Sequence, residues 1–262
     1  MKYYIMKNIC IRRTGRLGNF IQRIKNAIYV GLFYGYNIIL PEHDFFNTTY
    51  IIINPDVSTD AEKIIDEYDF HYSSKIENID VNLFKQNHDK VLQILKDIFI
   101  IKNEDLLDEN DLLIHIRSGD LFEGTHPHSG YISPPLSYYT DIINKTHFNT
   151  IYLIAEDRKN PCINGIIDLY PKIIFKIQSL KEDVKLLISA TNVISSFGTF
   201  IPQLLCVSDK IKNLYSPSYS FKCNKPGINN HYTTLTNYKT IMTPWKNSPE
   251  QHNLMMTYKL EA

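Results

Sequence analysis

The sequence predicts an α/β protein made of two halves that face each other across a cleft, with the N-terminal half reduced. Apolar, strand-like runs alternate with amphipathic helical runs along most of the chain, and strands separated by helices form parallel sheets. An acidic, turn-forming stretch over residues 102–110 divides this alternation into two parts. The 262 residues are few for two complete halves, so the first half is expected to be trimmed.

The N-terminal half, residues 1–105, is expected to begin with a strand, a turn, a helix and a second strand. Apolar residues recur at helical spacing after the turn, which predicts the helix, and Pro41 ends the second strand. Residues 42–80 mix turn formers with one strand-like run and are not assigned. The expected elements are a strand over 3–13, a turn over 14–19, a helix over 20–36, a strand over 37–41 and a helix over 81–100.

The C-terminal half, residues 106–262, alternates more clearly. Pro134 and Pro135 suit the first turn of a helix, and Ser179 with Glu182 forms a capping box before another. From residue 220 the chain reads as irregular, except for a final helix from Pro249 that we expect to pack back on the first half. The expected strands cover 111–117, 150–156, 172–178, 192–197 and 210–216, and the helices 134–146, 160–171, 179–191 and 199–208.

Composition limits the function. The chain has 28 Lys and Arg against 28 Asp and Glu, so no global field attracts nucleic acid and an anion needs a local site. The four cysteines are dispersed and indicate neither a zinc ribbon nor a disulfide framework. No signal peptide or transmembrane segment is apparent, so we expect a cytoplasmic protein, with peripheral attachment to a membrane left open.

The first candidate binding motif is TGRLGN, residues 14–19. Its glycines allow the backbone to approach a ligand, and the following helix offers free N–H groups to an anion. Arg16 and Asn19 add directed donors. The spacing fits neither a dinucleotide fingerprint nor a Walker loop. On its own, the motif is also compatible with a plain tight turn.

The second motif is HIRSGD, residues 115–120, where an apolar strand ends. A guanidinium at a strand end, here Arg117, can bind a diphosphate through two hydrogen bonds without a metal. A structural Arg117–Asp120 pair is the alternative. The nearby imidazoles and carboxylate fit no standard ligand spacing, so neither a metal nor another cofactor is expected. The side chains considered for such a site are His115, Asp120, His126 and His128.

The third motif is ISSFGTF, residues 194–200, between a predicted strand and a predicted helix. Its hydroxyl and N–H groups can donate to phosphate or ribose. An ordinary helix cap is the alternative.

Together the three motifs resemble those of protein O-fucosyltransferases and bacterial alpha-1,2-fucosyltransferases. GRLGN is similar to their G-R-F-G-N-Q and G-x-L-G-N-Q starts, HIRSGD to H-x-R-x-x-D, and ISSFGTF to I-x-S-S-F. Order and spacing agree, and the resemblance covers roughly residues 8–41 and 110–215. It implies a GT-B-like fold of two Rossmann-like halves. It also implies an inverting, metal-independent glycosyltransferase that moves a sugar from a nucleotide-sugar donor, in these families GDP-fucose, to a glycan or protein-linked acceptor.

Two departures from the family motifs bear on which sugar is transferred more than on the fold. Phe20 stands where the family has Gln, and Ser118 where it has a second Arg. A transferase using another nucleotide sugar therefore stays open, as does a non-catalytic protein that binds a nucleotide or glycan on the same scaffold.

The resemblance assigns roles to residues of each motif. Arg117 would hold the donor diphosphate and stabilise the leaving nucleotide, with His115 and Asp120 supporting it. Phosphate, ribose or sugar would be held by Ser195, Ser196, Phe197 and Thr199, and the cleft would be lined from the acceptor half by Arg16, Gly18 and Asn19.

The catalytic base is left open by the sequence. Inversion needs a group that takes the acceptor proton. Glu123 is one candidate, because related core alpha-1,6-fucosyltransferases place a glutamate shortly after the motif aspartate. His126 and His128 are others, and a route without a dedicated base is a further alternative. Tyr131 is a candidate for stacking on a base or sugar.

Overall fold

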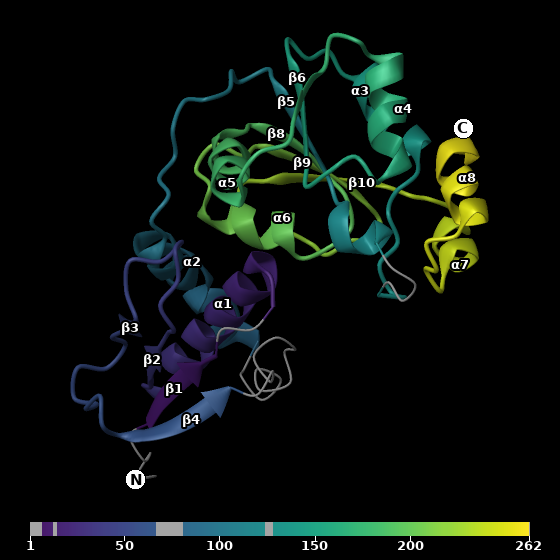
Figure 1. The fold of residues 1–262 in the computed structure, drawn as a ribbon. Coiled ribbons are helices and arrows are strands. Elements are labelled where there is room, and N and C mark those ends of the chain that lie inside the picture. Colours follow the sequence, from purple (N-terminus) through teal and green to yellow (C-terminus); the bar gives the residue numbers. More distant parts are fainter. Residues whose placement is uncertain (1–6, 13–14, 67–80, 124–127, 262) are drawn as a thin grey trace. The chain divides into compact units, whose positions relative to one another are not determined.

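The computed structural model describes residues 7–12, 15–66, 81–123 and 128–261. The chain consists of two compact units (Figure 1), an N-unit of Met1–Lys102 and a C-unit of Asn103–Ala262, where the sequence predicts a boundary after residue 105. Each unit contains a sheet with parallel strands and accompanying helices, which confirms the predicted α/β class. A cleft between the units stays a prediction. Among the described residues, no helix is both long and apolar enough to cross a membrane.

The N-unit has a four-stranded sheet in the order β3-β2-β1-β4. Strand β1 pairs in parallel with β2 and β4, and β3 runs antiparallel to β2. Strand β4 lies in the stretch that the sequence left unassigned. Within the described residues this sheet has four strands and that of the C-unit six, which agrees with the smaller first half that the sequence predicts. The elements are β1 (Lys7–Ile11), α1 (Leu17–Tyr34), β2 (Asn37–Ile39), β3 (Tyr50–Ile51), β4 (Glu62–Asp66) and α2 (Val81–Ile98).

Helix α1 begins at Leu17, three residues before the sequence prediction. It buries the apolar stripe that predicted it, including Ile21, Ile24 and Ile28. It ends where Gly35 adopts a left-handed φ of 71° and its N–H donates to the carbonyl of Gly31 at 2.8 Å.

The C-unit has a six-stranded, wholly parallel sheet in the order β10-β9-β8-β5-β6-β7. Counted along the chain within this unit, the order is the 3-2-1-4-5-6 arrangement of doubly wound folds, so the winding reverses between β5 and β8. The strands are β5 (Leu112–Ile116), β6 (Ile151–Ala155), β7 (Ile174–Lys176), β8 (Asn192–Ser195), β9 (Asn213–Pro217) and β10 (Asn229–Thr233). The helices are η2 (Gly119–Phe122), α3 (Leu136–Lys145), α4 (Pro161–Leu169), α5 (Leu180–Ser189), α6 (Phe200–Leu204), η3 (Leu205–Val207), α7 (Tyr238–Met242) and α8 (Pro249–Thr257).

Asparagine side chains join the amino ends of β8, β9 and β10. Asn213 donates to the Asn192 Oδ1 at 2.9 Å, and Asn229 donates to the Asn213 Oδ1 at 3.2 Å. The three residues are register partners in their strands. The Asn192 amide also donates to the carbonyls of Glu109 and Asp111. This asparagine ladder fixes the register at the amino edge of the sheet.

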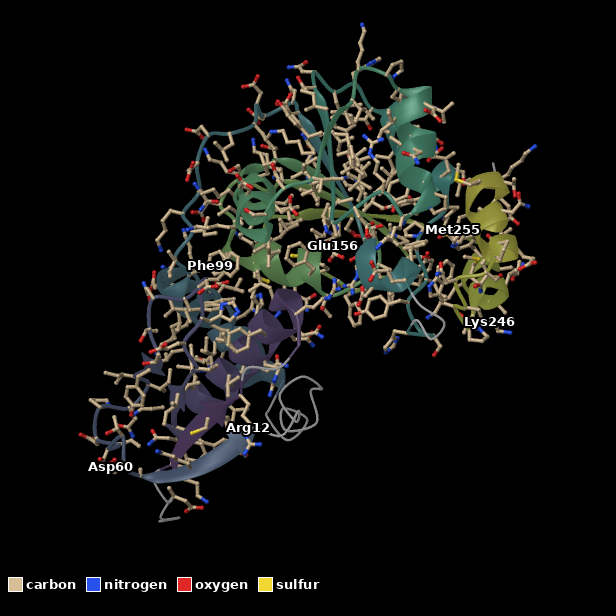
Figure 2. All side chains as sticks on the ribbon, viewed as in Figure 1. Arg12, Asp60, Phe99, Glu156, Lys246 and Met255 are labelled. Carbon is tan, nitrogen blue, oxygen red and sulfur yellow. The ribbon has the colours of Figure 1, made fainter. Side chains whose placement is uncertain are left out.

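The C-terminal helix α8 packs against α3 and α4 within the C-unit. Its Met255 (Figure 2) is fully buried in the same core as Tyr138 and Ile163. The expected packing of this helix on the first half stays a prediction, and within its own unit its apolar side lies in the core. The tail before it is also more regular than expected, because it contains β10 and α7.

Candidate functional site

Arg117 follows β5 at the point where the winding of the C-unit sheet reverses. Within β5, Leu112, Ile114 and Ile116 are buried in the core shared with α3 and α4. Side chains alternate along a strand, so His115 and Arg117 project from the opposite face. Ligands of doubly wound sheets bind at this reversal, outside the carboxyl ends of the strands. The local pattern thus delivers a cation to the usual ligand position of such a sheet.

The backbone of Arg117 is held by a hydrogen bond, and its guanidinium uses only part of its hydrogen-bonding capacity. Its N–H donates to the Ser196 Oγ at 3.0 Å, which joins the ends of β5 and β8. The guanidinium Nη2 donates to the Asp120 carboxylate at 3.0 and 3.3 Å and lies 5.0 Å above the Tyr131 ring. Its Nε is buried and has no hydrogen-bond partner among the described residues. An acceptor such as a phosphate oxygen would satisfy this N–H.

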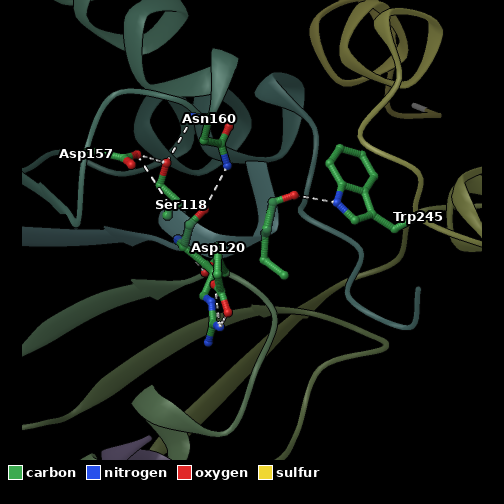
Figure 3. Close-up of polar contacts among 9 residues, drawn as sticks. Ser118, Asp120, Asp157, Asn160 and Trp245 are labelled. Carbon is green, nitrogen blue, oxygen red and sulfur yellow. Dashed lines mark hydrogen bonds and ion pairs between the residues drawn. The ribbon is translucent and has the colours of Figure 1, made fainter. Parts of the chain in front are cut away.

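The segment after Arg117 is bound to the loop that follows β6 (Figure 3). Ser118 Oγ donates to Asp157 Oδ1 and accepts from the Asn160 N–H at 3.0 Å. Asn160 Nδ2 donates to the Arg117 carbonyl at 3.0 Å, and the Gly119 N–H donates to Asp157 Oδ1 at 3.3 Å. Burial acts to raise the pKa of Asp157, but the hydrogen bonds from Ser118 and from backbone N–H groups outweigh it and lower that pKa.

Gly119 is required at its position for two reasons. Its φ of 58° is in the left-handed region, and a Cβ built on it would lie 1.9 Å from Glu156 Oε2. Glu156 follows β6 (Figure 2), so its carboxylate lies directly against the turn that carries Asp120. The glycine of the HIRSGD motif therefore lets the ends of β5 and β6 approach each other.

The same turn is attached to the C-terminal tail. Trp245 Nε1 donates to the Leu121 carbonyl at 2.8 Å (Figure 3), and its ring packs edge-on against Phe122 at 5.3 Å. Both Leu121 and Phe122 belong to η2. The tail thus anchors η2, while Ser196 and Asn160 hold the backbone of Arg117.

His115 is a neutral residue beside the arginine. Burial, followed by the positive charge of Arg117, lowers the pKa of His115 to about 3. Its ring lies 5.2 Å from Phe200, and its Nδ1 is buried without a hydrogen-bond partner among the described residues. At neutral pH this imidazole cannot add positive charge to the site.

The serines and threonine of the third motif divide between structural and site contacts. Ser195 Oγ bonds to the Tyr215 carbonyl and the Ser216 hydroxyl, so it faces β9. Ser196 Oγ instead accepts from the Arg117 N–H. Thr199 is the buried N-cap residue of α6, and its side chain makes no capping hydrogen bond.

Phe197 belongs to a row of aromatic rings that extends from Arg117. Its ring lies 5.4 Å from Tyr131, 5.8 Å from Tyr219 and 5.7 Å from Phe221. Phe221 is exposed. The row offers flat apolar surface beside a cation, which suits a sugar or a base.

The candidate bases differ in their surroundings. Glu123 is exposed and forms an ion pair with Lys159, whose Nζ also lies 3.2 Å from Asp157 Oδ2. His128 is exposed, its Nδ1 accepts from the Gly130 N–H at 3.3 Å, and its ring lies 5.0 Å from Tyr131. His126 lies outside the described residues.

Asp183 is a site candidate that the sequence reading missed. It is buried in the first turn of α5, and its Oδ1 has no hydrogen-bond partner among the described residues. Burial raises the pKa of Asp183 to about 6; a hydrogen bond with the Gln178 side chain acts against this shift, and the negative charges of Glu156 and Glu182 add to it. The sequence did hold a signal for this burial: Asp183 lies four residues before Leu187, so both fall on the helical face that is buried. Asp183 and Glu156 place two carboxylates near the ends of β7 and β6.

The first motif lies in the N-unit at the start of α1. Gly15 has a left-handed φ of 79°, and Arg16 is the N-cap residue, without a side-chain capping bond. Gly18 and Asn19 lie in the first helical turn rather than in the expected loop, because the apolar stripe already begins at Leu17, which is buried. N–H groups of a first turn have no acceptor within the helix. The approach of this motif to Arg117 stays a prediction.

Packing in the N-unit accounts for a phenylalanine at position 20. Phe20 is buried, its ring stacks on His43 at 4.8 Å, and it meets Phe46 edge-on at 5.5 Å.

Among the described side chains, no group of three or more His, Cys, Asp or Glu is arranged to hold a metal ion.

Comparison with known proteins gives distant likenesses only. No protein-family model matches the chain, and no curated protein does. E. coli heptosyltransferase WaaC with ADP-2-deoxy-2-fluoro heptose matches with a TM-score of 0.46 and 8% identity, over 87% of this chain and 93% of that one. Fucosyltransferase NodZ from Bradyrhizobium matches with 0.43 and 10%, over 78% and 93%. POFUT1 in complex with GDP matches with 0.43 and 8%, over 87% and 98%.

Proposed function

We propose that the chain is an inverting glycosyltransferase that uses a nucleotide-sugar donor. The observation that carries this proposal is Arg117. It stands at the winding reversal of a doubly wound sheet, its backbone is fixed to β8, and its buried Nε–H lacks an acceptor among the described residues. A diphosphate supplies two acceptor oxygens at the spacing of a guanidinium edge.

Arg117 would act mainly on the leaving group. As the bond between sugar and diphosphate breaks, negative charge grows on the phosphate oxygens, and a fixed guanidinium stabilises that charge without a reorganisation step. Neutral His115 beside it adds no charge, so the guanidinium is the positive charge that we assign to the diphosphate. We propose that this charge is sufficient without a divalent ion.

Asp183 and Glu156 would select the donor base and ribose. A buried carboxylate whose Oδ1 has no partner among the described residues accepts N–H donors well. Guanine offers two such donors side by side, its ring N–H and its exocyclic amino group. This chemistry supports a guanine nucleotide and, with the motif resemblance, GDP-fucose as the donor. Another nucleotide sugar is the near alternative.

The acceptor would be a hydroxyl of a glycan or a glycan-bearing molecule. Its proton needs a receiver, and Glu123 is the proposed base, with His128 as the next candidate. In this role Glu123 would exchange its ion pair with Lys159 for the acceptor hydroxyl. Asn19 and Arg16 would complete the site from the N-unit.

A donor screen by thermal shift tests the proposal. GDP and GDP-fucose, added with a metal chelator, are expected to raise the melting temperature by several degrees through preferential binding to the folded state. Absence of a shift with GDP-, UDP- and dTDP-sugars alike would contradict a nucleotide-sugar site. Slow hydrolysis of the bound donor without acceptor would separate an enzyme from a non-catalytic binding protein.

A further inference from the structure

The peptide segment that carries Arg117 follows β5 and is held by hydrogen bonds from the ends of two other strands, β6 and β8. The Arg117 N–H is bound by Ser196 after β8, and its carbonyl by Asn160 after β6. Ser118 is fully buried and bonds to Asp157 and to the Asn160 N–H. The Arg117 N–H, the Arg117 carbonyl and the Ser118 hydroxyl thus all serve to fix the backbone from which the guanidinium extends.

We infer that Ser118 and Asn160 are positioning residues, which set the guanidinium of Arg117 for the donor diphosphate; the inference rests on the proposed function. A guanidinium gains affinity for a diphosphate only when both N–H donors are aimed together. The Asp120 contact orients the guanidinium only relative to the backbone that carries both residues. The bonds of Ser118 and Asn160 fix that backbone before the donor binds.

The chemistry of the two side chains suits this role. Ser118 Oγ uses its single proton on Asp157 and a lone pair on the Asn160 N–H, and the residue is fully buried, so its hydroxyl serves the fold of this turn. Asn160 divides its amide between two tasks. Its Oδ1 caps α4 by accepting from the Cys162 N–H at 3.0 Å, and its Nδ2 reaches the Arg117 carbonyl.

Two variants test the inference, with one matched control. Ser118→Ala removes both Oγ contacts. Asn160→Asp keeps the helix cap and replaces the donor to the Arg117 carbonyl with a carboxylate oxygen, and melting curves check that each variant is folded. Ser208→Ala is the control, because Ser208 is also fully buried and bonds to the Ile188 carbonyl and two backbone N–H groups. Ser208 precedes β9, so it lies near the amino ends of the strands, whereas Ser118 and Asn160 lie near the carboxyl ends.

The first readout is solvent exchange of the Arg117 Nε–H, followed by NMR and assigned with Arg117→Lys. We expect Ser118→Ala and Asn160→Asp to speed this exchange at least tenfold in the unliganded protein, and Ser208→Ala to leave it unchanged. The second readout is donor affinity, expected to weaken about tenfold in both site variants and not in the control. The acceptor KM is expected to stay constant.

The outcomes separate the positioning role from the proposed function. Unchanged Nε–H exchange in both site variants overturns the inference, as does equal loss of affinity in the Ser208→Ala control. Faster exchange in the site variants of a protein that binds no nucleotide sugar leaves the positioning role standing and removes the donor assignment.

Discussion

The backbone N–H of Arg117 and the hydroxyl oxygen of Ser196 are 3.0 Å apart. This hydrogen bond connects the first residue after β5 to the first residue after β8, across the reversal of winding in the sheet. It places a cation and a strand-end turn in one fixed arrangement. The predictions below follow from that arrangement and from the charges around it.

Arg117→Ala is expected to lower kcat at least 100-fold while the protein stays folded. The guanidinium is the charge that meets the developing diphosphate, whereas the contacts of its side chain with Asp120 and Tyr131 are local. Arg117→Lys keeps the charge without the planar fork and should recover only part of the rate. Steady-state kinetics and melting curves measure this, and near-normal turnover of the alanine variant would refute the assigned role.

Glu123→Gln tests the proposed base. The amide keeps the shape but cannot take a proton, so we expect kcat to fall at least 100-fold with donor affinity unchanged. Lys159→Met serves as the comparison, since it removes the ion pair and leaves the carboxylate in place. If kcat of Glu123→Gln equals that of the wild type, Glu123 is a bystander and His128 is the next residue to change.

Asp183→Asn is expected to stabilise the fold at neutral pH. The pKa of Asp183 is about 6 in the folded protein against 3.8 ordinarily, so between these values the folded state keeps a proton that the unfolded chain has lost. The free energy of unfolding therefore decreases as pH rises through this window, and the deficit is complete above pH 6. Removing it should add on the order of 1–3 kcal/mol at pH 7.5.

Urea denaturation at pH 4 and pH 7.5 measures this effect, and the gain should nearly vanish at pH 4. The same substitution is expected to weaken binding of GDP at least tenfold at pH 7.5, because the amide presents an N–H where a second acceptor is needed. A variant that is more stable and binds GDP normally would show that Asp183 has no part in base selection.

Asn192→Ala is expected to destabilise the C-unit without affecting the site. The change leaves the carbonyls of Glu109 and Asp111 and the amide of Asn213 without their partner, at a cost of roughly 2–3 kcal/mol. A lower urea midpoint with unchanged donor affinity is the expected result. Loss of donor affinity in the folded variant would mean that the strand register at the amino ends of the strands also determines the geometry of the site at their carboxyl ends.

Local patterns made most of the fold predictable. The capping box of Ser179 and Glu182 is present as expected. The apolar runs form β5, β6 and β8, and burial is continuous along β5 and β8 and covers the last three residues of β6. Strand β10 was missed because Asn229–Thr233 is polar and its pairing with β9 is a tertiary effect. The start of α1 was misplaced because the glycine at position 18 read as part of a turn.

Contacts of the candidate site could be predicted from the sequence only where both partners lie within one short motif. Arg117 and Asp120 are three residues apart, so their pairing could be anticipated. The bonds of Ser118 with Asp157 and Asn160 join segments about 40 residues apart, and no local pattern announces them. The raised pKa of Asp183 depends on burial and on Glu156 from another strand end, which spacing alone does not reveal.

The chain contains a single tryptophan, and its indole hydrogen-bonds to the turn that carries Asp120. Its intrinsic emission is therefore an unlabelled reporter of that turn, and occupancy by a nucleotide can be titrated by fluorescence at low protein concentration. The same contact means that shortening the chain before Trp245 removes an anchor of the turn. Fusion tags are better placed after the last helix than in exchange for it.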